Sequence, residues 1–133
     1  MKRKHINIDI RAIPHKKHRY ETVGDYWTGK NGKEQIRVSQ MSDSRYELGV
    51  ILHELIEDFL CQHRGIKEKD IMKFDVKYEK ERTQGLHKPD DEPGHDKNAP
   101  YHKEHVFAEK IEMLFMHELG CDWDKYSDEV ESL

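Results

Sequence analysis

Residues 44–63 have the sequence SRYELGVILHELIEDFLCQH and predict the central helix of the domain. Ser42, Asp43 and Ser44 are residue types that favour a helix N-cap, Glu47 follows Ser44 by three positions as in a capping box, and Gly65 suits the C-terminal cap. Two stripes of side chains recur at spacings of three and four, so we expect a helix buried on both sides. The apolar stripe is Leu48, Leu52, Leu55 and Phe59, and the mixed stripe is Tyr46, Val50, His53, Glu57 and Cys61.

Residues 101–119 predict a second long helix, which follows Pro100 and ends before Gly120. Its apolar residues form a broad face, and a stripe of histidines and glutamates lies beside that face. The apolar face consists of Val106, Phe107, Ile111, Leu114 and Phe115, and the polar stripe of His102, His105, Glu109 and Glu112.

The N-terminal third of the chain predicts strands. Residues 5–13 alternate strictly, which indicates a strand, and residues 20–27 and 35–39 flank a turn rich in glycine and asparagine at 28–33, which indicates a hairpin. We therefore predict an α+β fold, with a small antiparallel sheet packed on the two long helices. The charged residues 66–82 predict a short helical or strand-like satellite, and residues 83–99 a long polar loop near the site.

Length and composition set the class of protein. A chain of 133 residues is long enough for one domain, and we expect residues 1–133 to form it, with flexible arms at 1–4 and 122–133. No run approaches the roughly 18 apolar residues of a membrane span, and no apolar signal core follows the basic N-terminus, so we expect a cytoplasmic protein without membrane contact. Cys61 and Cys121 lack paired spacing and predict packing thiols.

The net charge of −4 conceals an uneven distribution, since residues 1–19 are rich in lysine and arginine and residues 104–133 are mostly acidic where charged. A basic arm of this kind can contact nucleic acid, but no aromatic-interleaved patch or reader motif accompanies it. A non-enzymatic interaction module that uses this arm is therefore an alternative that we rank below a metal site.

The chain contains ten histidines, which is an unusually high number for its length. His53 and Glu57 are four apart on the first helix and project from one face, which is how a helix presents two ligands to one metal ion. Glu54 points to another side, where such a neighbour can take a proton from the attacking water. His105 and Glu109 repeat the spacing on the second helix, one turn after His102. These ligands suffice for one zinc ion with supporting carboxylates, or for two metals.

The residues that carry this pattern resemble a known family. The strand-like 35–39, the cap residues 42–44 and the helix LGVILHELIE at 48–57 are similar to the zincin metallopeptidases, which place a strand before an HExxH helix and take a third ligand from further along the chain. The resemblance implies that His53 is a zinc ligand and Glu54 the general base, with the third ligand among His102, His105 and Glu109. The chain departs from the family at Glu57, where zincins have histidine.

A helical histidine and glutamate four apart also occur by chance as a surface pair. The mixed stripe carries no lysine or arginine, and a buried carboxylate such as Glu57 must be paired, protonated or bound to a metal. We therefore expect a zinc-dependent, peptidase-type hydrolase acting on a peptide or protein. The alternatives are a two-metal phosphoesterase or a structural metal site. For Tyr101 we expect a packing role, with donation to an oxyanion as the alternative. For residues 90–96 we expect a solvated loop, with a substrate lid or an extra cation site as the alternative.

Overall fold

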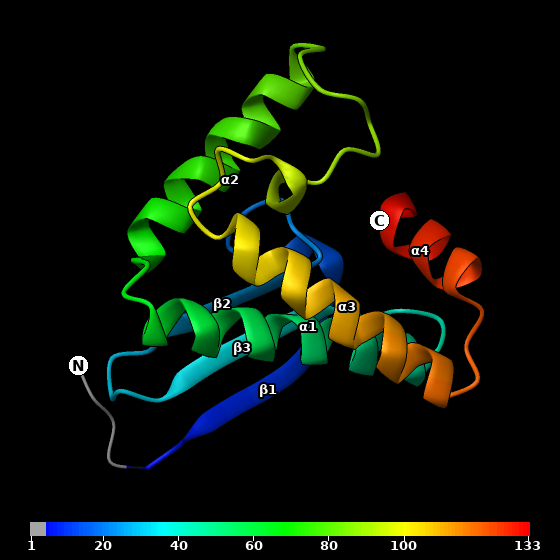
Figure 1. The fold of residues 1–133 in the computed structure, drawn as a ribbon, viewed down its shortest axis with the longest axis horizontal. Coiled ribbons are helices and arrows are strands. Elements are labelled where there is room, and N and C mark those ends of the chain that lie inside the picture. Colours follow the sequence, from blue (N-terminus) through cyan, green and yellow to red (C-terminus); the bar gives the residue numbers. More distant parts are fainter. Residues whose placement is uncertain (1–4) are drawn as a thin grey trace.

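The computed structural model describes residues 5–133, and the predicted arm at 1–4 lies outside the described residues. Figure 1 shows a small sheet at one side of the molecule with helices stacked on it. The elements are β1 (Ile8–Ile13), the 3-10 turn η1 (His15–Lys17), β2 (Gly24–Thr28), β3 (Glu34–Ser39), α1 (Ser44–His63), α2 (Glu68–Thr83), the 3-10 turn η2 (Pro93–His95), α3 (His102–Glu118) and α4 (Trp123–Ser132). The predicted α+β class and both long helices are confirmed.

The sheet is mixed rather than purely antiparallel, and this corrects the prediction in part. Its strand order is β1-β3-β2. The predicted hairpin is present, because β2 pairs antiparallel with β3, but β1 runs parallel to β3 with Ile10 opposite Ile36. Alternation of apolar and polar residues along a strand shows which residues share a face. It does not determine whether the neighbouring strand runs parallel or antiparallel. Residues 14–23 carry the chain from β1 at one edge of the sheet to β2 at the other, and β3 then returns between them, parallel to β1.

Helix α1 lies between the sheet and α3, since it contacts β2, β3 and α3 (Figure 1). Asp43 is its N-cap and accepts a hydrogen bond from the amide of Arg45, while Glu47 accepts one from the amide of Met41. The two stripes of α1 differ in burial from the prediction. The mixed stripe is the buried one, and Leu48 in the apolar stripe is 45% exposed. The reason is that the mixed stripe faces the sheet and α3, so the polar groups are at the centre of the fold.

The charged segment after α1 forms a full helix, α2, with Ile71, Asp75 and Tyr78 buried. The following residues 84–92 contain no helix or strand, and η2 comes next, so the predicted polar loop is present. The segment from residue 122, expected to be a flexible arm, forms α4 instead. Tyr126 anchors α4, because its ring is 1% exposed and its hydroxyl donates to Glu112 of α3. Within residues 5–133, no helix is long and apolar enough to span a membrane.

Gly49 is the point at which α1, α3 and α4 meet. A Cβ added there would lie 2.6 Å from Sδ of Met116 and 2.8 Å from the hydroxyl oxygen of Tyr126. Alanine normally stabilises a helix relative to glycine by about 1 kcal/mol. Here we expect Gly49→Ala to lower the free energy of unfolding by about 1–3 kcal/mol, because the methyl group overpacks a filled core. Urea denaturation measures this, with Leu48→Ala as the exposed control. A Gly49→Ala protein at least as stable as the wild type would contradict the packing.

Candidate metal centre

Three side chains from two helices converge at the centre of the fold, and we call them the inner cluster: His53 and Glu57 of α1 and His105 of α3. The Nε2 atom of His53 lies 3.0 Å from Oε2 of Glu57 and 3.0 Å from Nδ1 of His105. The same Glu57 oxygen lies 2.9 Å from Nδ1 of His105. Two imidazole nitrogens and one carboxylate oxygen thus form a nearly equilateral triangle.

The triangle has the size and chemistry of a divalent-cation site. Nitrogen and oxygen ligands of tetrahedral zinc, at about 2.0–2.1 Å from the ion, are separated from one another by roughly 3.3 Å. The sides of the inner cluster, at 2.9–3.0 Å, fall just short of that separation. A displacement of a few tenths of an ångström would therefore admit an ion. Two histidines and a glutamate are also a ligand set that catalytic zinc sites use.

Further groups fix the direction of each ligand. Nδ1 of His53 lies 2.6 Å from a carboxylate oxygen of Glu112, which accepts its proton and leaves Nε2 facing the inner cluster. The Tyr26 hydroxyl of β2 donates to Oε1 of Glu57 at 2.8 Å, which leaves Oε2 facing the same point. Carboxylates behind ligating histidines and donors behind ligating carboxylates are the usual supports of a metal site.

The pKa values of the inner cluster show how tightly its charges interact. Burial by itself would lower the pKa of His53, but hydrogen bonds to Glu112 and Glu57 raise it well above its ordinary value. Burial likewise acts to lower the pKa of His105, but a hydrogen bond to Glu57 and the nearby carboxylate of Glu92 raise it to about 9. Burial acts to raise the pKa of Glu57, yet hydrogen bonds from His105 and His53 lower it to about 2. A cation would therefore compete with protons for the two histidines.

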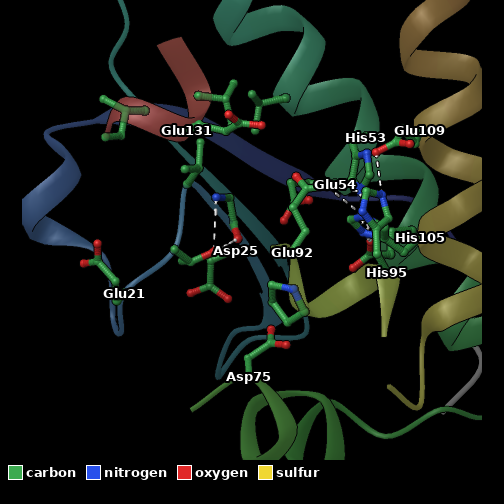
Figure 2. Close-up of a pocket in the computed structure, with 18 of the residues that line it drawn as sticks. Glu21, Asp25, His53, Glu54, Asp75, Glu92, His95, His105, Glu109 and Glu131 are labelled. Atoms are coloured by element: carbon green, nitrogen blue, oxygen red, sulfur yellow. Dashed lines mark hydrogen bonds and ion pairs between the residues drawn. The ribbon is translucent and has the colours of Figure 1, made fainter. Parts of the chain in front are cut away.

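Glu54 lies in the same turn of α1 as the inner cluster and is 8% exposed. Its side chain packs against strand β2, where a Cβ on Gly24 would come within 2.6 Å of the carboxyl carbon, so any larger residue at position 24 would displace the Glu54 carboxyl. Burial and the neighbouring Glu57 raise the pKa of Glu54 well above its usual value. Glu54 and the inner cluster line a cavity of about 580 Å³. Figure 2 shows Glu54 beside His53 and His105 at one side of this cavity.

The structure brings together three of the five predicted metal ligands, namely His53, Glu57 and His105. Glu109 lies one turn further along α3, in a neighbouring group with Glu92, His95 and His105 that could also hold a metal. His102 lies apart from both groups, because its Nδ1 donates to the backbone oxygen of Gly94 at 2.9 Å. Sequence reasoning missed Glu92 and His95 as partners of α3, although both lie in the loop where an extra cation site was one hypothesis.

Tyr101 has its hydroxyl engaged in a structural network rather than directed at the inner cluster. Asp75 of α2 accepts hydrogen bonds from the hydroxyls of Tyr101 and Tyr20, the latter at 3.0 Å. This carboxyl therefore ties α2 to the start of α3 and to the segment before β2. Burial raises the pKa of Asp75 to about 7, although the hydrogen bonds from the two tyrosines act to lower it.

Asp75 gives the fold a predictable dependence on pH. Because its folded-state pKa of about 7 lies above the ordinary value of 3.8, the protonated carboxyl stabilises the fold fully below pH 3.8, and this contribution is lost as the pH rises through 7. Asparagine has no proton to lose. Between pH 5 and pH 8, the free energy of unfolding should therefore fall by about 1 kcal/mol or more less in Asp75→Asn than in the wild type. Urea denaturation at both pH values tests this. Equal losses in both proteins would refute the assignment.

Comparison of the chain with protein-family models, with curated proteins and with solved structures finds no match.

Proposed function

We propose that the protein is a zinc-dependent hydrolase with a zincin-like, peptidase-type site. The observation that carries the proposal is the inner cluster, in which His53, Glu57 and His105 aim one ligand atom each at a common point. Glu54, the residue next to His53, lies at the edge of the cavity that this point adjoins. Strand β3 precedes α1, and α1 carries the HExxE pattern at residues 53–57. Both features are those in which the chain resembles the zincins.

The ligand residues would hold the ion with one coordination position left for substrate or water. A zinc ion held by two histidines and a glutamate supplies a Lewis acid that acidifies water and polarises a carbonyl group. Glu112 would keep His53 in the tautomer whose Nε2 lone pair is free for the ion, and Tyr26 would hold the Glu57 carboxylate in place. The fold thus provides a rigid support for the reaction.

Glu54 would act as the general base. Its carboxyl is buried with no lysine or arginine among the groups that set its pKa, which is why that pKa is raised. A nearby divalent cation lowers the pKa of a carboxyl and would bring Glu54 toward the range in which it can accept a proton at neutral pH. Its place beside Gly24 also puts it between the inner cluster and strand β2.

A peptide or protein is the substrate class that fits the cavity best. Strand β2 is at the edge of the sheet, with β3 on one side only. Residues 22–26, which include most of this edge, line the cavity. A strand that pairs on one side only could hydrogen-bond an extended peptide on the other, and the cavity volume suits several side chains.

The two-metal phosphoesterase alternative fits less well. Its two ions lie about 3.5–4 Å apart and share an oxygen. The two candidate groups share only His105, whose nitrogens point in different directions. Ions bound one to each nitrogen would be roughly 6 Å apart with bonds of about 2.1 Å, which is too far for a shared oxygen.

We also propose a cytoplasmic location, because Cys61 and Cys121 are free thiols.

Hydrolysis assays test the proposed function. Purified protein loaded with Zn²⁺ should cleave members of a fluorogenic peptide library, lose this activity after chelation and regain it on addition of Zn²⁺. A phosphodiester such as bis-p-nitrophenyl phosphate serves as the rival substrate and should remain intact. Metal-dependent cleavage of the phosphodiester alone would favour the two-metal alternative, and no metal-dependent cleavage of any peptide would refute the peptidase-type assignment.

A further inference from the structure

A second group of side chains lies next to the inner cluster, and we call it the outer cluster: Glu92, His95, His105 and Glu109. One ligand atom of each residue lies within 4.8 Å of the others. Nε2 of His95 is 2.8 Å from a carboxylate oxygen of Glu109 and 3.2 Å from one of Glu92. The loop that ends in η2 supplies Glu92 and His95, and α3 supplies the other two. Figure 2 shows Glu92, His95, His105 and Glu109 beside His53.

The outer cluster has the composition of a cation site rather than of an ordinary ion-pair network. Within residues 5–133, the ion pairs of Glu92 and Glu109 are with histidines alone and involve no lysine or arginine. In these ion pairs, protons on His95 and His105 supply the positive charge that compensates the two carboxylates. A divalent cation would supply that charge, and two imidazoles with two carboxylates are ligands of the kind that zinc binds.

His105 provides an independent observation. Its Nδ1 faces the inner cluster, whereas its Nε2 is buried and has no hydrogen-bond partner. The nearest carboxylate oxygen, from Glu92, is 3.8 Å away, which is beyond hydrogen-bond distance. A buried polar nitrogen without a partner costs free energy unless another ligand satisfies it. This nitrogen points into the outer cluster.

The loop that carries Glu92 and His95 is held in place by contacts that need no cation. The guanidinium of Arg82 donates to the backbone oxygens of Lys88, Pro89 and Asp91. Gly94 lies so close to His105 that an added Cβ would be 2.3 Å from the ring. The ligand positions are therefore pre-formed, which reduces the entropy cost of binding.

We propose that the outer cluster is a second divalent-cation site of the zinc class, held by Glu92, His95 and Glu109 beside the inner site. A neutral imidazole offers one lone pair. With Nδ1 protonated toward Glu57, the Nε2 lone pair of His105 is a fourth ligand for the outer ion. An ion on Nδ1 instead leaves the proton on Nε2, and the outer ion then has three protein ligands that are more exposed than those of the inner site. The outer site binds more weakly for this reason. The inference goes beyond the proposed function and does not require the inner site to be catalytic.

Zinc titration of the metal-depleted full chain at pH 7, in competition with a chromogenic chelator, tests the proposal. The wild type should bind two ions, the second at least tenfold more weakly. His95→Ala and Glu109→Gln should each lose the weaker ion and keep the tighter one, whereas His53→Ala should keep one ion and His53→Ala/His95→Ala none. Glu118→Gln, an exposed change further along α3, is the matched control and should still bind two.

The outcomes separate this inference from the proposed function. One ion in the wild type, unchanged by His95→Ala or Glu109→Gln but lost in His53→Ala, would overturn the outer site and leave the inner one. One ion that His95→Ala removes and His53→Ala retains would support the outer site and refute the inner one. A second ion that persists in a His95→Ala/Glu109→Gln variant would lie elsewhere on the surface and would also overturn the proposal. Circular dichroism verifies that each variant is folded.

Discussion

His53→Ala and His105→Ala should each lower the affinity of the protein for its more tightly bound zinc ion by at least a hundredfold. Each change removes one of three ligands that point at a common centre, and even loss of a supporting group usually costs 10–100-fold in metal affinity. Elemental analysis of protein purified without added metal should show a corresponding loss of zinc. Competition titration then gives the change in affinity.

The expected loss is graded by the role of each residue. Glu112→Gln should weaken zinc binding by about 10–100-fold, since Glu112 supports His53 and does not contact the ion. His117→Ala is the matched control, because His117 is an exposed histidine near the end of the same helix. Its zinc content should equal that of the wild type. Wild-type affinity in both His53→Ala and His105→Ala would eliminate the inner cluster as a metal site.

The local features of the fold were predictable, because caps and periodicity are encoded within a few residues. Residues 44–63 form α1 as predicted, since Asp43 and Gly65 delimit it. The direction of β1 was not predictable, because alternation carries no information about a distant partner strand. Nor was the burial of the two stripes of α1, which depends on where the sheet and α3 pack rather than on hydrophobicity alone.

The candidate site was predictable to the extent that it lies on helices. The spacing of His53 and Glu57 follows from helix geometry, and so does that of His105 and Glu109. Spacing did not distinguish His102 from His105, because the deciding contact is a hydrogen bond from His102 to Gly94 in a loop. Glu92 lies in that loop, and Tyr26 reaches Glu57 from a strand 31 residues away, so neither has a periodic signal.

Glu54→Gln should lower the turnover number of peptide hydrolysis by 10²–10⁴-fold while leaving zinc affinity within a few-fold of the wild type. The magnitude is that of a general acid-base group, and glutamine has the same shape but accepts no proton. The variant should also fold, because the raised pKa of Glu54 means that the folded protein already favours a neutral group at this position. A loss of activity would then reflect the lost proton acceptor rather than unfolding.

The measurement is the turnover number of the zinc-loaded variant, with bound zinc and thermal unfolding recorded on the same sample. Glu118→Gln is the control for the chemical change, since Glu118 is an exposed glutamate on α3, and it should keep wild-type turnover. A general base must change protonation during each turnover, whereas a purely structural Glu54 would tolerate glutamine without loss of rate. Wild-type turnover in Glu54→Gln would therefore assign proton transfer to another group, even if the metal site is intact.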